Sequence, residues 1–132
     1  MEKAEAKKKI LVIDDDEIHL SMAQNILGKK YDVIISKTGK EAINILLNGV
    51  IPCLILLDII MPHMDGWETY NKLKGLSLLK DCPIVFVTSL DGADNRENAK
   101  RLGAAGYITK PFKTEDFLEQ VNSILTNSTF EC

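Results

Sequence analysis

Acids, hydroxyls and an amine directly follow separate apolar runs in this sequence. In chain order they are Asp14, Asp15 and Asp16, then Asp58, then Thr88 and Ser89, and finally Lys110. Each preceding run has the length of a β-strand. Because the carboxyl ends of parallel strands meet at one edge of an open sheet, where α/β folds bind their ligands, we expect these side chains to share one cleft.

Such a cleft predicts chemistry with a hard cation and a phosphoryl group. Two carboxylates about 4 Å apart repel by roughly 4 kcal/mol at an effective dielectric of about 20. The acids Asp14, Asp15 and Asp58 therefore need a proton or a cation. Oxygen ligands with few protein donors favour Mg²⁺, while Lys110 and Thr88 can face phosphoryl oxygens. An aspartate can also attack phosphorus and form an acyl phosphate.

Alternating strand-length and helix-length segments predict the scaffold that positions these residues. Continuous apolar runs such as Leu54–Leu57 are typical of strands covered on both faces, and the alternation predicts an α/β fold with a parallel sheet. The predicted strands are Lys9–Ile13, Tyr31–Ser36, Cys53–Leu57, Ile84–Val87 and Tyr107–Thr109.

Amphipathic segments between these runs predict five helices. They are expected at Glu17–Leu27, at Lys40–Leu47, after Asp65 and Gly66, at about Ala93–Leu102, and from Thr114, which is the expected N-cap residue. Ile18, Met22 and Ile26 form the predicted core-facing stripe of the first helix, and Ala42, Ile45 and Leu46 form that of the second. Gly28 and Gly103 fit the C-caps of the first and fourth helices.

Length and composition indicate one folded domain. The chain has 132 residues, of which 45% are hydrophobic and 27% charged, and its formal charge is −3. We predict a flexible leader at residues 1–8, the domain at 9–126 and a frayed tail at 127–132. No apolar run has the length of a membrane span, and basic residues do not form a stripe suited to nucleic acid, so neither partner is expected.

The cysteines favour a reducing environment. Cys53, Cys82 and Cys132 are odd in number and lack CxxC spacing, and Cys53 lies in an apolar run that is expected in the core. Free thiols in a cytoplasmic protein are the simplest interpretation.

Five separated motifs resemble the receiver domain of two-component response regulators, of the chemotaxis-regulator type. They are Ile10–Asp16, Leu57–Pro62, Met64–Gly66, Val87–Ser89 and Gly106–Phe112, in the order and spacing of that family. The resemblance covers about Lys9 to Thr126. It implies a flavodoxin-like, doubly wound five-stranded parallel sheet of order 2-1-3-4-5 with five helices.

The resemblance also implies a role for each site residue. Asp58 would accept a phosphoryl group, Lys110 would pair with it, and Thr88 would move inward to bond it. Asp15, Asp58 and the backbone carbonyl of Ile60 would hold Mg²⁺ directly, with Asp14 acting mainly through water. Tyr107 would be the switching aromatic residue, although an aromatic side chain at a sheet edge is more often simply packed. The Lys110–Pro111 bond would be cis.

A signalling module that catalyses only its own phosphorylation and dephosphorylation is therefore the leading hypothesis. Its partners would be a histidine kinase or histidine phosphotransfer protein and an unknown downstream protein, which binds the face of the fourth helix, fifth strand and fifth helix. The module would be a monomer or a phosphorylation-dependent dimer. It would be a stand-alone protein, a phosphorelay intermediate or part of a larger regulator.

Two enzyme or carrier functions compete with it. A Mg²⁺-dependent phosphatase with an aspartyl nucleophile shares the chemistry, but Ile60 occupies the position of its second acid. A flavin carrier shares the fold, but an acidic cleft repels the cofactor phosphate.

His19 and His63 have no partner at metal-ligand spacing and are expected to be structural or exposed. Asp16 and Glu17 are expected to do no more than cap a helix.

Overall fold

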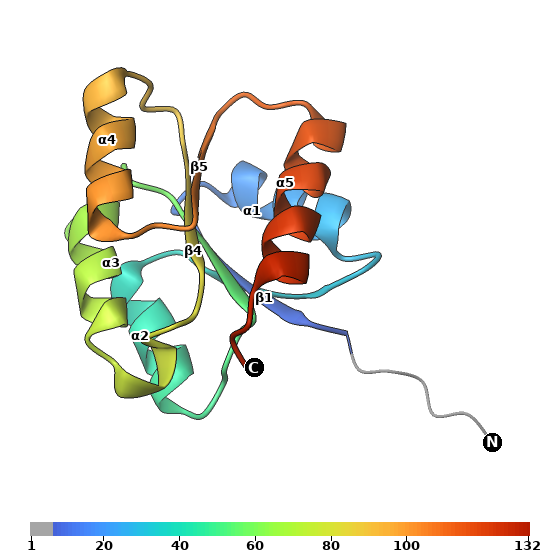
Figure 1. Ribbon diagram of the computed structural model, residues 1–132, viewed down its shortest axis with the longest axis vertical. Helices are drawn as coiled ribbons and strands as arrows, with labels where there is room; N and C mark the ends of the chain where they lie inside the picture. The colour runs from blue at the N-terminus through green and yellow to red at the C-terminus, as the bar shows by residue number, and fades with distance from the viewer. Residues whose placement is uncertain (1–6) are drawn as a thin grey trace.

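The five apolar runs form one parallel sheet in the computed structural model, which describes residues 7–132 (Figure 1). Its strands are β1 (Lys9–Ile13), β2 (Asp32–Ser36), β3 (Leu54–Leu57), β4 (Ile84–Thr88) and β5 (Gly106–Thr109). The order is β2-β1-β3-β4-β5, as the resemblance implies. β1, β3 and β4 are the inner strands, and apart from Lys9 all of their residues are buried, which explains their uninterrupted apolar sequences.

Helices cover both faces of this sheet. They are α1 (Glu17–Leu27), α2 (Gly39–Leu47), α3 (Gly66–Lys74), α4 (Ala93–Leu102) and α5 (Thr114–Asn127), with a short 3₁₀ helix at Ser77–Leu79. Figure 1 shows α1 and α5 on one side of the sheet and α2, α3 and α4 on the other. Two hydrophobic clusters match these layers. Within residues 7–132, no helix combines the length and the apolar character needed to cross a bilayer.

The buried face of α1 differs from the sequence prediction, whereas that of α2 agrees with it. The stripe predicted to bury α1 is wrong for two of its three residues, since Ile18 is 70% exposed and Met22 48% exposed. Ile26 is partly buried against the core, where Leu20, Ala23 and Leu27 are buried. The two sets lie on adjacent faces of one helix, and sequence spacing alone did not fix which face meets the sheet. The second helix has the predicted face, since Ala42 and Leu46 are buried.

Of the caps predicted for the later helices, the C-cap of α4 is present and the N-cap of α5 is not. α5 begins at Thr114, but its N-cap residue is Lys113 and no side chain caps it, so the predicted Thr114 cap is wrong by one position. Gly103 ends α4 in the left-handed conformation, with φ of 90°, as expected for a C-cap glycine. The Lys110–Pro111 bond is cis, as the resemblance implies.

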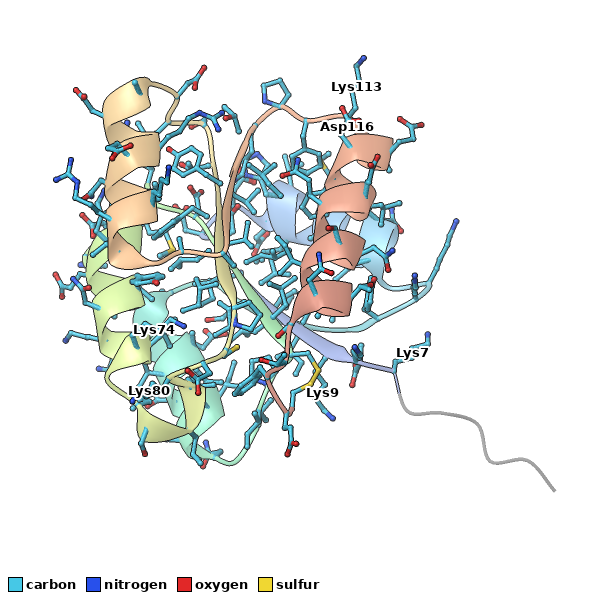
Figure 2. All side chains as sticks on the ribbon, viewed as in Figure 1. Lys7, Lys9, Lys74, Lys80, Lys113 and Asp116 are labelled. Carbon is cyan, nitrogen blue, oxygen red and sulfur yellow. A yellow bond between two sulfur atoms is a disulfide. The ribbon has the colours of Figure 1, made fainter. Side chains whose placement is uncertain are left out.

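The end of the chain packs against the domain instead of fraying. Cys132 forms a disulfide with Cys53, directly before β3 (Figure 2), and Phe130 packs half-buried on the core. The expectation of free thiols is therefore wrong for these two cysteines, because sequence did not reveal that the tail returns to β3. Residues 1–6 of the predicted leader lie outside the described residues, and Lys7 donates to the Gly28 carbonyl at 3.3 Å.

The remaining thiol, Cys82, predicts a loss of stability at alkaline pH. Burial raises the pKa of this thiol to about 12 from an ordinary 9.0. The pKa of the thiol is raised in the folded state. The folding stability that depends on this shift is therefore fully present below pH 9 and is lost as the pH rises toward 12. Urea unfolding in non-reducing buffer should show the wild type losing about 2 kcal/mol more than Cys82→Ala between about pH 8 and pH 10.5. Parallel pH profiles for the two proteins would contradict this expectation.

Candidate functional site

The carboxyl ends of β1, β3 and β5 bring three of the predicted site residues together. Ile13 pairs with Leu57 in the sheet, so Asp14 and Asp58 leave neighbouring strands at the same level. The Asp58 amide donates to the Ile13 carbonyl at 3.0 Å, and the Lys110 amide donates to the Thr88 carbonyl at 2.8 Å. Backbone hydrogen bonds therefore fix where each side chain leaves the sheet.

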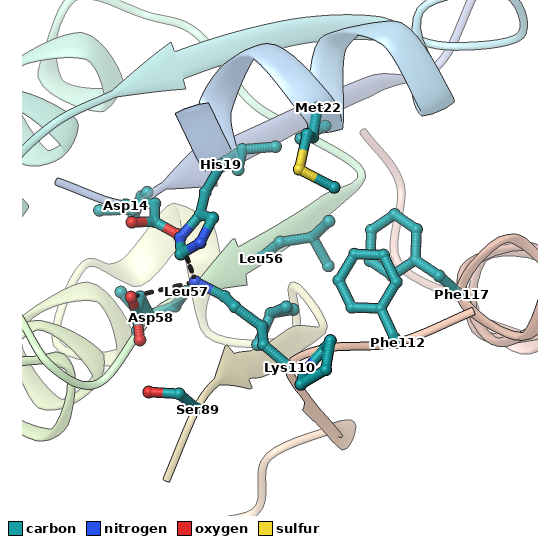
Figure 3. Close-up of a pocket in the computed structure, with 15 residues that line it drawn as sticks. Asp14, His19, Met22, Leu56, Leu57, Asp58, Ser89, Lys110, Phe112 and Phe117 are labelled. Atoms are coloured by element: carbon teal, nitrogen blue, oxygen red, sulfur yellow. Dashed lines mark hydrogen bonds and ion pairs between the residues drawn. The ribbon is translucent and has the colours of Figure 1, made fainter. Parts of the chain in front are cut away.

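Lys110 bridges the two acids. Its Nζ lies 2.6 Å from Asp14 Oδ2 and 3.2 Å from Asp58 Oδ2 (Figure 3). The three side chains are only 11%, 6% and 9% exposed, respectively. Charge-assisted hydrogen bonds of this kind hold the ammonium and both carboxylates in one cleft. The predicted convergence of Asp58 and Lys110 is confirmed.

Asp15 and Asp16 follow Asp14 but have exposed side chains. Asp16 caps α1, where its Oδ1 accepts from the Ile18 amide at 2.8 Å and from the His19 amide at 3.4 Å. These hydrogen bonds, the one from Ile18 above all, lower the pKa of Asp16. Asp16 is thus a helix cap, as expected. Asp15 is exposed, and the cluster of ligand atoms in the cleft is made by Asp14, His19 and Asp58 without it.

The segment after Asp58 is held close to the acid. The Ile60 amide donates to Asp58 Oδ1 at 3.3 Å, and the Gly66 amide donates to the Ile59 carbonyl at 2.8 Å. Ile60 itself is 52% exposed. Asp65 caps α3 by accepting from the Glu68 amide at 3.0 Å, which anchors the other end of the loop.

Thr88 and Tyr107 meet at the backbone of Leu90. Thr88 is fully buried, and its Oγ1 accepts from the Leu90 amide at 3.3 Å. The Tyr107 hydroxyl donates to the Leu90 carbonyl at 2.6 Å, and the Arg96 guanidinium lies 5.0 Å from the centre of the Tyr107 ring. Partial burial raises the pKa of the Tyr107 hydroxyl. One peptide segment thereby connects the two residues that the resemblance assigns to switching.

His19 is a site residue that sequence reasoning missed. Its Nδ1 lies 2.9 Å from Lys110 Nζ and 3.3 Å from Asp14 Oδ2, so the expectation that it has no partner is wrong. The available signal was its place in the first turn of a helix that starts directly after the acids.

The donor set fits a divalent cation. Asp14, His19 and Asp58 each offer one ligand atom, and these atoms lie within 4.8 Å of one another. Two buried carboxylates with a single lysine leave a negative charge in the cleft, which a cation can neutralise. A cavity of about 390 Å³ adjoins the cluster and extends between α1 and α5, past Met22, Phe112 and Phe117.

The sheet order and the acidic cleft at its carboxyl edge define a flavodoxin-like α/β protein. The chain belongs to the response regulator receiver domain family, whose sequence profile matches residues 10–122. It is therefore a signalling module of two-component systems. The sequence-based identification of the family is confirmed.

Individual relatives agree with this assignment. Protein PilG of Pseudomonas aeruginosa is 32% identical over 93% of this chain and 91% of its own length. The alkaline phosphatase synthesis regulator PhoP of Bacillus subtilis is 36% identical over 92% of this chain, which spans 50% of that protein. The chain covers about half the length of most of the first curated relatives it matches.

Solved structures show the same fold. The receiver domain of HemR from Leptospira biflexa, in its non-phosphorylated form, has a TM-score of 0.84 and 31% identity, covering 96% of this chain and all of the other (100%). The chemotaxis protein CheY4 of Vibrio cholerae has a TM-score of 0.84 and 28% identity, covering 90% of this chain and 99% of that one.

Proposed function

We propose that Asp58 accepts a phosphoryl group from a phosphohistidine on a histidine kinase or histidine phosphotransfer protein. The observation that carries this proposal is the burial of Asp58 against Lys110, with Nζ 3.2 Å from Oδ2, at the carboxyl edge of the sheet. A carboxylate oxygen attacks phosphorus, the P–N bond breaks, and its electron pair returns to the imidazole of the donor. Hydrolysis of the acyl phosphate by water regenerates Asp58.

The charged groups of the cleft support both steps. Lys110 faces the incoming phosphoryl oxygens and balances their charge. Asp14, Asp15, Asp58 and the Ile60 carbonyl would hold Mg²⁺, with Asp14 acting mainly through water. The ion, when bound, neutralises charge on the transferring phosphoryl group. Catalysis is limited to the module's own phosphorylation and dephosphorylation.

The phosphoryl group would act on the rest of the molecule through Leu90. It adds about −1.5 to −2 charges beside Thr88. When the Thr88 side chain moves inward to donate to a phosphoryl oxygen, its Oγ1 moves away from the Leu90 amide, and Leu90 also carries the carbonyl that accepts from Tyr107. Tyr107 then leaves its present position, which changes the face formed by α4, β5 and α5. A downstream protein, or a second copy of the chain, binds that face. We infer a cytoplasmic location because the phosphoryl donor acts there.

Thr88→Ala should separate phosphorylation from this response. With acetyl phosphate and Mg²⁺, the wild type should show large shifts of the Leu90 and Tyr107 amide resonances in NMR spectra. The variant should take up the phosphoryl group but shift these amides by less than about half as much, because its side chain has no hydroxyl to move. Ser77→Ala, which removes an exposed hydroxyl from the short 3₁₀ helix, should respond like the wild type. Full shifts in Thr88→Ala would refute the coupling.

Intact-mass measurement tests the acceptor role itself. After incubation with acetyl phosphate and Mg²⁺, the wild type should gain the mass of one phosphoryl group, and a chelator should prevent the gain. Asp58→Asn should gain none, whereas Asp65→Asn, which alters an exposed acid at the start of α3, should behave like the wild type. Equal phosphorylation of Asp58→Asn would remove Asp58 from the proposed role.

A further inference from the structure

His19 gives the acidic cleft a nitrogen atom with a free electron pair. Its Nδ1 lies 2.9 Å from Lys110 Nζ, and a lysine ammonium has only hydrogens to offer. A hydrogen bond from the lysine to Nδ1 corresponds to the tautomer with the ring proton on Nε2, which we assign to His19. An imidazole in this tautomer presents to the cleft the electron pair that a metal ion binds.

We propose that His19 is a ligand of the divalent ion held in this cleft, and that it gives the site a preference for ions that bind imidazole, such as Zn²⁺ and Co²⁺. This inference rests on the cation site of the proposed function and goes beyond it. There, oxygen atoms alone hold Mg²⁺. Here, a side chain outside that oxygen set determines which ion is retained.

The distances support joint coordination by three residues. One ligand atom each of Asp14, His19 and Asp58 lies within 4.8 Å of the others, and His19 Nδ1 is 3.3 Å from Asp14 Oδ2. Around a tetrahedral ion with bonds of about 2.0–2.2 Å, ligand atoms lie about 3.3–3.6 Å apart, so the widest separation in this cluster must contract by up to about 1.5 Å. The His19 side chain is 39% exposed and lies in the first turn of α1, which leaves it room to make that adjustment.

Lys110 occupies the position that the ion would take. Its Nζ contacts Asp14, Asp58 and His19 at 2.6, 3.2 and 2.9 Å, so one positive charge already lies among all three ligand groups. A divalent ion would displace the ammonium and neutralise both carboxylates. Charge therefore favours the exchange.

The identity of the third ligand decides selectivity. Mg²⁺ binds oxygen and gains little from imidazole, whereas Zn²⁺ and Co²⁺ bind imidazole nitrogen well. Replacing His19 should therefore weaken the transition ions and leave Mg²⁺ almost unaffected. A merely structural role for His19 would change all three affinities together.

Calorimetric titration with each metal alone tests this selectivity. The full chain, freed of metal with a chelator, is compared as wild type, His19→Leu and His63→Asn. His63 is a matched control because it is exposed in a loop with φ of 68°, a conformation that asparagine also adopts. We expect His19→Leu to lose about tenfold or more in Zn²⁺ and Co²⁺ affinity. Its Mg²⁺ affinity should change less than about twofold, and His63→Asn should match the wild type.

Two results would overturn the inference. One is unchanged Zn²⁺ and Co²⁺ affinity in His19→Leu, and the other is an equal loss in His63→Asn, which would indicate adventitious binding to surface histidines. NMR of the wild type provides a readout that needs no variant: Zn²⁺ should shift the ¹⁵N resonance of His19 Nδ1 far more than that of Nε2, and equal small shifts would contradict ligation. Phosphorylation of Asp58 with Mg²⁺ is scored separately, so the inference and the proposed function can fail independently.

Discussion

Lys110→Met is expected to lower the free energy of unfolding by about 3–5 kcal/mol in metal-free buffer. The substitution removes an ammonium that contacts both Asp14 and Asp58, so two carboxylates that are less than one tenth exposed lose this cationic partner. Urea unfolding in the presence of a chelator measures the loss. In saturating Mg²⁺ the loss should be smaller, because the ion replaces the missing charge.

A matched control separates this effect from the general loss of a lysine. Lys113 is exposed three residues further along the chain, and Lys113→Met should change stability by less than about 0.5 kcal/mol. Adding Asp14→Asn to Lys110→Met should recover part of the loss, because the repulsion between the carboxylates is removed. A loss below about 1 kcal/mol, or no recovery in the double variant, would contradict the pairing of these charges.

Gly66→Ala is expected to have the second large effect, at about 3 kcal/mol or more of unfolding free energy. A Cβ atom at this position would lie 2.3 Å from the Asp58 carbonyl oxygen and 2.5 Å from Ile59 Cα. Both are backbone atoms and cannot rotate away, so the loop that follows Asp58 must shift. Stability and phosphorylation by acetyl phosphate should both fall. Urea unfolding measures the first, and the intact-mass assay measures the second.

Gly75→Ala is the appropriate comparison. Gly75 ends the same helix, and a Cβ there would meet nothing closer than the Lys72 carbonyl oxygen at 3.4 Å. Its φ of −73° suits alanine, so stability should change by less than about 1 kcal/mol. Wild-type stability in Gly66→Ala would contradict the close contact between the start of α3 and the Asp58 loop.

The sheet and its acidic edge could be predicted because each depends on local sequence. Uninterrupted apolar runs such as Leu54–Leu57 predicted inner strands, and a polar residue after a run predicted the position of Asp58 and Lys110. The order of the strands is not encoded in periodicity; it came from the resemblance of the motifs to a family. The sequence therefore sufficed for the fold and for the two residues at the centre of the proposed chemistry.

The errors concern features that depend on tertiary contacts. Which face of α1 meets the sheet decides that Leu20 is buried and Ile18 exposed, and both faces are apolar enough to be chosen. The same orientation of α1 places His19 beside Lys110. The pairing of Cys53 with Cys132 depends on the path of the last residues, on which sequence gave no information. Short-range patterns do not contain these contacts.

Reductive trapping of the phosphorylated protein tests the central claim most directly. Borohydride reduces an aspartyl phosphate to homoserine, so treatment after incubation with acetyl phosphate and Mg²⁺ marks the residue that carried the phosphoryl group. Peptide mass spectrometry should find homoserine at position 58, and omission of acetyl phosphate should leave aspartate there. Homoserine at Asp14, Asp15 or another acid, or at no position in a protein that has gained a phosphoryl group, would contradict the assignment of Asp58.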